Sequence, residues 1–216
     1  MKKLVVIFGM VVALVGFMTV GSVLATVVID FGTGNAGSGG TITIAGSNSS
    51  GADIPVETMT VSGDPGYNGT YYLSGAQTTS SNANANANGA AVLTFNSLTG
   101  TITVVGGVPG LGIANGTTLL TGTGDSFVVT LSNGVLGSVQ GTGPDTKSAT
   151  LLTDLGISGA PFALFGFTTG FDITGGGSPY TDISTDITNT SIPEPATLLL
   201  LGTGLIGAGL FRRFRG

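Results

Sequence analysis

The chain has 216 residues, with 11 Asp and Glu, 6 Lys and Arg, 39 Gly, and no Cys, His or Trp. This length allows one globular domain with terminal appendages. The lack of His and Cys excludes a Ser-His-Asp triad, a cysteine nucleophile, disulfides and a zinc site with nitrogen or sulfur ligands. A net charge of −5 offers no basic footprint for nucleic acid, so we expect no nucleic-acid partner.

The N-terminus has the pattern of an export signal. Lys2 and Lys3 precede an uncharged, mostly apolar run over residues 4–20, and small residues stand before a junction after Ala25. The pattern predicts a signal peptide over residues 1–25 that is cleaved after Ala25. An uncleaved membrane anchor is the alternative, because the apolar run is longer than the roughly 7 to 15 residues of a typical signal core.

Residues 26–190 are predicted to form an all-β domain. Short segments rich in β-branched or aromatic residues, bounded by Gly, Asn, Ser or Pro, occur at residues 26–31, 41–45, 57–61, 71–73, 91–95, 101–105, 126–131, 135–140 and 162–167. Such spacing is typical of a β-sandwich, jelly-roll-like or related. Asn133-Gly134 predicts a hairpin between two of these strands, and Asn68-Gly69 predicts a second hairpin.

Three further segments carry local expectations. Residues 162–167 are apolar on both faces, which predicts a central strand at the densest part of the core. A short helix is expected over residues 146–155, with Asp145 as its N-cap and Gly156 after its end, and a strand is the alternative. Residues 82–88 alternate Asn with Ala and are expected to form a surface loop.

Carboxylates are the remaining source of chemistry. Asp172, Asp182 and Asp186 lie in a stretch interpreted as loop-rich, and oxygen ligands of this kind suit Ca²⁺. Solvated carboxylates at turns are the other interpretation of these residues, and we expect no cofactor. Asp53 and Glu57 are the one closely spaced pair that suggests the two carboxyl groups of a glycoside hydrolase.

The C-terminus has three consecutive features. Pro193-Glu194-Pro195 favours an extended backbone that a protease can bind. The uncharged residues 196–211 predict a short transmembrane helix of about 24 Å. Arg212, Arg213 and Arg215 follow as stop-transfer charges and predict a cytoplasmic C-terminus.

This order of features resembles the PEP-CTERM sorting signal of Gram-negative bacteria. The resemblance rests on residues 192–202 and on the terminal arginines, and it assigns residues 191–216 as a sorting and anchor segment. It implies processing by an exosortase, a membrane-embedded cysteine transpeptidase encoded alongside exopolysaccharide genes. It also implies transient residence in the inner membrane. A plain C-terminal anchor that is never cut is the alternative.

The sequence therefore favours an exported, non-enzymatic protein of the cell surface or the exopolysaccharide matrix of a biofilm, with a structural or adhesive role. Residues 26–192 hold ten acidic residues and a single basic one, Lys147, which gives this region a net charge of −9. The alternatives are a Ca²⁺-dependent glycan-binding module and a carboxylate-dependent glycoside hydrolase. The lack of Trp and the low number of Tyr count against both, because sugar-binding platforms are usually aromatic.

Overall fold

The fold is all-β, as predicted. The computed structural model describes residues 27–33, 39–64, 66–75, 89–124, 126–132, 136–157, 162–174 and 177–191. Within these residues the strands are β1 (Val28–Gly32), β2 (Gly39–Ala45), β3 (Asn48–Val56), β4 (Thr58–Ser62), β5 (Gly69–Tyr72), β6 (Ala91–Asn96), β7 (Thr101–Val108), β8 (Ile113–Thr123), β9 (Ser126–Ser132), β10 (Leu136–Gly143), β11 (Asp145–Lys147), β12 (Phe162–Asp172) and β13 (Tyr180–Ser191). A 3₁₀-helix, η1 (Pro109–Leu111), and an α-helix, α2 (Ala149–Asp154), complete the described elements.

The strands form one antiparallel sheet that branches at β13. One edge of β13 pairs with β12. The other edge pairs first with β2, through Tyr180, Thr181 and Asp182, and then with β1, from Asp186 to Thr190. β1 and β2 therefore follow each other along the same edge of β13, although they lead into different parts of the sheet.

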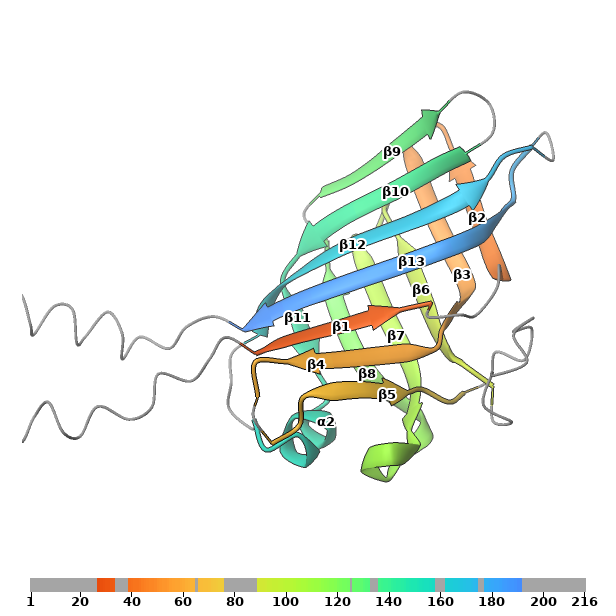
Figure 1. Ribbon diagram of the computed structural model, residues 1–216. Coiled ribbons are helices and arrows are strands. Elements are labelled where there is room, and N and C mark those ends of the chain that lie inside the picture. Colours follow the sequence, from red (N-terminus) through yellow and green to blue (C-terminus); the bar gives the residue numbers. More distant parts are fainter. Residues whose placement is uncertain are drawn as a thin grey trace, which may run out of the picture. The chain divides into compact units, whose positions relative to one another are not determined.

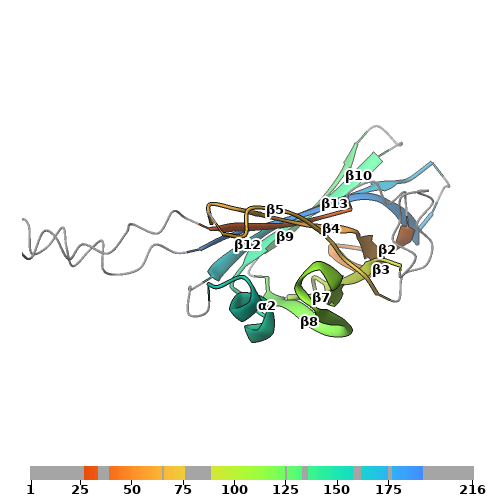
Figure 2. The same cartoon turned by 60° about the horizontal axis from the view of Figure 1, so that its bottom comes forward.

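The branched sheet has two layers that face each other (Figures 1 and 2). The front layer has the order β5-β4-β1-β13-β12-β10-β9, and the back layer has the order β2-β3-β6-β7-β8-β11. The β2–β13 pairing connects the two layers, and a bridge between Ser74 and Gly107 joins them near β5. The layers thus belong to one continuous sheet, and a jelly-roll-like topology stays a prediction.

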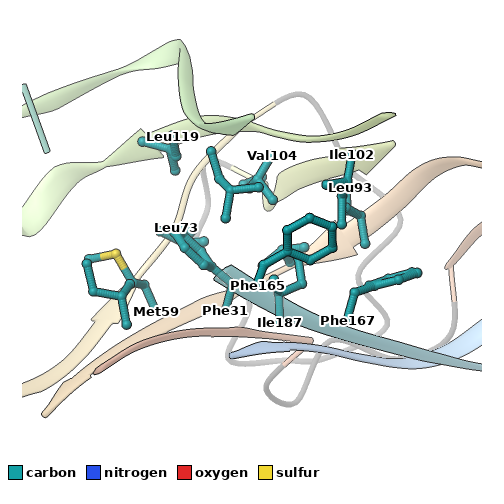
Figure 3. Close-up of a cluster of buried hydrophobic side chains, with 14 of the residues drawn as sticks. Phe31, Met59, Leu73, Leu93, Ile102, Val104, Leu119, Phe165, Phe167 and Ile187 are labelled. Carbon is teal, nitrogen blue, oxygen red and sulfur yellow. The ribbon is translucent and has the colours of Figure 1, made fainter. Parts of the chain in front are cut away.

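The core lies between the two layers. Successive side chains of a strand point to opposite faces, so alternate residues enter the core. Figure 3 shows this arrangement: Phe31, Phe165 and Ile187 of the front layer point towards side chains of the back layer, which are Leu93, Ile102, Val104 and Leu119. The Phe95 and Phe167 rings meet across the layers with centroids 4.9 Å apart.

Each of the nine segments predicted as strands overlaps an observed strand. β9 and β10 pair as a hairpin, with Ser132 opposite Leu136, although Asn133-Gly134 lies outside the described residues. β4 and β5 form the second hairpin, in which Gly69 is the first residue of β5. Three strands, β3, β8 and β13, were not predicted, and β11 overlaps the start of residues 146–155, for which a strand was the alternative to a helix. The expected loop at residues 82–88 lies outside the described residues.

Two local expectations need correction. β12 is central, because it pairs with both β10 and β13, but it is not buried on both faces. Phe165 and Phe167 are buried, whereas Gly166, which lies between them, and Thr168, which follows them, are exposed. The expected core position is therefore correct for one face only, because the small residue and the hydroxyl on the other face do not need burial.

The helix begins later than expected, and Asp145 is not its N-cap. Residues Asp145–Lys147 form β11, and Ser148 caps the helix by accepting a hydrogen bond from the Leu151 amide at 3.4 Å. Asp145 is unavailable for capping because its side chain is buried together with Lys147. Gly156 follows the helix end with a positive φ of 66°, a conformation that glycine adopts without strain.

Candidate functional site

The three predicted calcium ligands are not brought together. Asp172 ends β12 and accepts a hydrogen bond from the Thr174 amide at 2.7 Å, which lowers the pKa of its carboxyl group. Asp182 is buried and Asp186 is exposed, both on β13 rather than in a loop. Among the described residues, no group of three or more carboxylates could hold a metal ion.

Asp182 belongs to a buried polar cluster at the branch of the sheet. Its Oδ1 accepts hydrogen bonds from the Thr169 hydroxyl and, at 3.3 Å, from the Thr185 hydroxyl. The Thr185 hydroxyl also contacts that of Thr169 at 3.0 Å. Burial raises the pKa of Asp182 to about 6, against the opposing effect of these donors. The cluster lies where β13 changes its partner from β2 to β1, which favours a role in fixing that branch.

Asp30 and Asp186 form a carboxyl pair that the sequence did not reveal. They stand on neighbouring strands, in register with Thr188 and Gly32 respectively, so they are diagonal neighbours on the outer face of the front layer. Partial burial raises the pKa of Asp30 to about 7, and a hydrogen bond to Asp186 and repulsion by its charge add to this rise. Asp30 therefore binds a proton near neutral pH in the folded protein.

The one basic residue of the domain region is buried. Lys147 and Asp145 are alternate residues of β11, and their side chains form a buried salt bridge. Burial lowers the pKa of the Lys147 ammonium to about 8, although the charge of Asp145 opposes this change. Because Lys147 is buried, the surface of the described residues presents no basic side chain to a partner.

The two carboxylates considered for glycoside hydrolysis have different environments. Asp53 is exposed in β3 and has a positive φ of 56°, which Asp tolerates better than most residues. Glu57 is buried between β3 and β4, and its amide donates a hydrogen bond to the Gly32 carbonyl at 3.0 Å. This difference in exposure gives no support to a shared catalytic groove.

The end of the last strand places the predicted sorting motif next to the domain. β13 ends at Ser191, and Ile192 is the single residue between this strand and Pro193. Thr190 pairs with Val28, so the first and last strands meet at this end of the sheet (Figure 1). The motif itself, Pro193-Glu194-Pro195, lies outside the described residues, as do the signal-cleavage residue Ala25 and the arginines.

The apolar segment predicted to span the membrane, residues 196–211, also lies outside the described residues. In the part of the chain that the structure describes, no helix has the length and hydropathy of a membrane span.

An all-β domain is followed directly by a segment with the predicted features of a sorting signal, and this order defines the general class of protein. Residues 191–215 match the family described as the PEP-CTERM protein-sorting motif, which confirms the resemblance and is consistent with an exosortase substrate. The motif implies an exported protein that passes by way of the membrane. Comparisons with curated proteins and with solved structures gave no match.

Proposed function

We propose that this protein is an exosortase substrate whose β domain has a structural or adhesive role, without catalysis, at the cell surface or in the exopolysaccharide matrix. The match of the sorting motif at residues 191–215, directly after β13, is the observation that carries the proposal. In this proposal the signal peptide is removed after Ala25 and the tail holds the chain transiently in the inner membrane. The exosortase then processes the tail.

The chemistry of the surface supports a particular kind of contact with the matrix. The domain region carries ten acidic residues, and its one basic residue is buried. Such a surface repels an anionic polymer and is compatible with a neutral one. The outer face of the front layer also presents hydroxyl groups that suit hydrogen bonding to polymer hydroxyls, among them Thr58, Thr60, Thr168 and Thr188.

The sorting step is tested by replacing Pro193-Glu194-Pro195 with three alanines. We expect the full-length chain to accumulate in the inner membrane, because the apolar segment remains while the recognition element is lost. The size and location of the β domain are followed by immunoblotting of cell fractions, with and without the exosortase.

A matched variant replaces Arg212, Arg213 and Arg215 with alanines. This variant keeps the recognition element and is expected to disturb orientation and membrane retention first, because it removes the stop-transfer charges. If the triple-alanine variant at residues 193–195 is processed as efficiently as the original chain, the exosortase proposal is wrong and a plain anchor is the better interpretation.

A further inference from the structure

Strand β9 is an open edge of the sheet. Among the described strands, β5, β9 and β11 each have one pairing partner. β5 and β11 are short, with 4 and 3 residues. The chain bridges to the back layer just after β5, through Ser74 and Gly107, and α2 follows directly after β11. β9 has 7 residues, and β10 is its one strand partner in the described part of the chain.

The edge of β9 lacks the features that usually protect an edge strand. Lys residues, Pro residues and bulges normally prevent a second chain from pairing with free backbone groups. β9 contains no Pro and no charged residue, and its pairing with β10 is regular from Ser126 to Ser132. Large apolar side chains are exposed on both of its faces, with Val128 52% and Leu131 56% exposed.

The sequence of β9 is nearly symmetric about its centre. Ser126-Phe127-Val128 precedes Val129, and Thr130-Leu131-Ser132 follows it. In an antiparallel pair with a second copy, centred on Val129, Ser126 faces Ser132, Phe127 faces Leu131, and Val128 faces Thr130 of that copy. This register places each side chain opposite one of similar kind and covers the exposed Leu131 with an aromatic ring.

The hairpin of β9 and β10 offers an uncharged surface at which two negatively charged copies can associate. Two copies of a domain region with a net charge of −9 repel each other unless they meet at an uncharged surface. Residues 126–144 contain no charged residue. In the register centred on Val129, the two β9 strands pair over their whole length, from Ser126 to Ser132, without a charged residue on either copy.

We propose that β9 is a self-association edge, at which two copies of this chain pair antiparallel about a two-fold axis through Val129. The pairing joins the front layers of the two copies into one continuous sheet. Phe127 holds the strand in place for this contact, because its ring stacks on Phe95 of the back layer with centroids 6.3 Å apart. The inference does not rest on the sorting of the chain, because association is a property of the folded domain.

The first test uses a matched pair of lysine variants of the exported chain. Thr130→Lys places a charge on the edge strand, whereas Thr94→Lys places the same charge on β6, which has partners on both sides. Sedimentation equilibrium should show a dimer for the original chain and for Thr94→Lys. We expect Thr130→Lys to raise the dissociation constant at least tenfold, which corresponds to about 1.4 kcal/mol. The proposal is overturned if both variants associate equally, or if both lose association equally. It is also overturned if the original chain stays monomeric at about 100 µM.

The second test uses the lack of cysteine in the natural chain. Val129→Cys should form a disulfide-linked dimer under mild oxidation, because directly opposite residues of paired strands are close enough for a disulfide. Thr94→Cys is the matched control at an exposed mid-strand position. No enrichment of cross-linked dimer for Val129→Cys over Thr94→Cys contradicts the proposed register, even if the lysine variants fold poorly.

Discussion

Asp30 and Asp186 place two carboxyl groups on neighbouring strands, on the outer face of the front layer. Their proximity has a thermodynamic consequence, because a group that binds protons more tightly in the folded state makes stability depend on pH. The pKa of Asp30 is about 7 in the folded protein, far above its ordinary value of 3.8. The folded state therefore holds a proton that the unfolded chain releases at a much lower pH.

We expect the free energy of unfolding to fall as the pH rises from about 4 to about 7, because Asp30 and Asp182 both have raised pKa values in the folded state. Above pH 6 the fall should come mainly from Asp30. Asp30→Asn should remove that part, on the order of 1 kcal/mol after allowance for solvent screening. Urea unfolding of the exported chain between pH 6 and pH 7.5 measures this change.

Asp172→Asn is the control for the loss of a charge. Its carboxyl group is exposed, and the Thr174 amide keeps its pKa low, so it is ionised throughout this range of pH. The Asp172 variant should keep the original pH dependence. If the Asp30→Asn variant also keeps the original pH dependence, the carboxyl groups of Asp30 and Asp186 do not interact in solution as the structure indicates.

At the scale of elements, β13 is the most informative of the strands that the sequence does not predict. β13 was interpreted as part of a loop-rich stretch because it contains few apolar residues. Among its described buried residues, Asp182, Thr185 and Asn189 are polar and only Ile187 is apolar. Its position in the front layer comes from three strand partners, β1, β2 and β12, and not from a local pattern. β3 was missed for a related reason: its Asn, Gly, Asp and Pro residues are typical of turns.

Two glycines of neighbouring strands give a matched test of strand packing. A Cβ atom at Gly143, the last residue of β10, would overlap the carbonyl oxygen of Thr123 at the end of β8. At Gly166 in β12 the nearest neighbouring atom is 4.0 Å from the added Cβ. Gly143→Ala should therefore lower the free energy of unfolding by about 1 to 3 kcal/mol.

Gly166→Ala should leave this free energy unchanged or raise it by about 0.4 to 1 kcal/mol, because alanine restricts the unfolded chain. Urea denaturation of both variants measures the difference. A similar loss of stability in both variants would mean that the contact between the ends of β8 and β10 is not close in solution.

For the molecule as a whole, the pairing of the first strand with the last determines when the front layer can be completed. Val28 of β1 lies opposite Thr190 of β13, so the front layer is complete only when nearly the whole domain is available. Contacts between such distant parts of a chain form late, because closing a long loop costs conformational entropy. In the proposed export route, completion of the sheet therefore follows translocation of β13 across the membrane.

The short distance between β13 and the sorting motif leads to a further prediction. Ile192 alone separates Ser191 from Pro193, so the folded sheet begins next to the residues that the exosortase is proposed to bind. A flexible Gly-Ser linker of about ten residues after Ile192 adds an average span of roughly 16 to 19 Å. We expect this insertion to accelerate tail processing, as followed by pulse-chase labelling.

The same linker placed before the triple-alanine version of residues 193–195 is the control and should not be processed. An unchanged or slower rate for the linker variant with the natural motif would show that the folded domain does not hinder access.

The sequence by itself determined the features that depend on neighbouring residues. The exclusion of several catalytic classes follows from composition, and the sorting segment follows from the order of its prolines, apolar residues and arginines. The strands with β-branched and aromatic residues were also predictable, because their pattern is local. The tertiary structure alone decided the position of β13, the contact between Asp30 and Thr188 across 158 positions, and the open edge of β9. These features depend on which strands pair, and pairing is selected by packing and register across the whole domain, which no local pattern encodes.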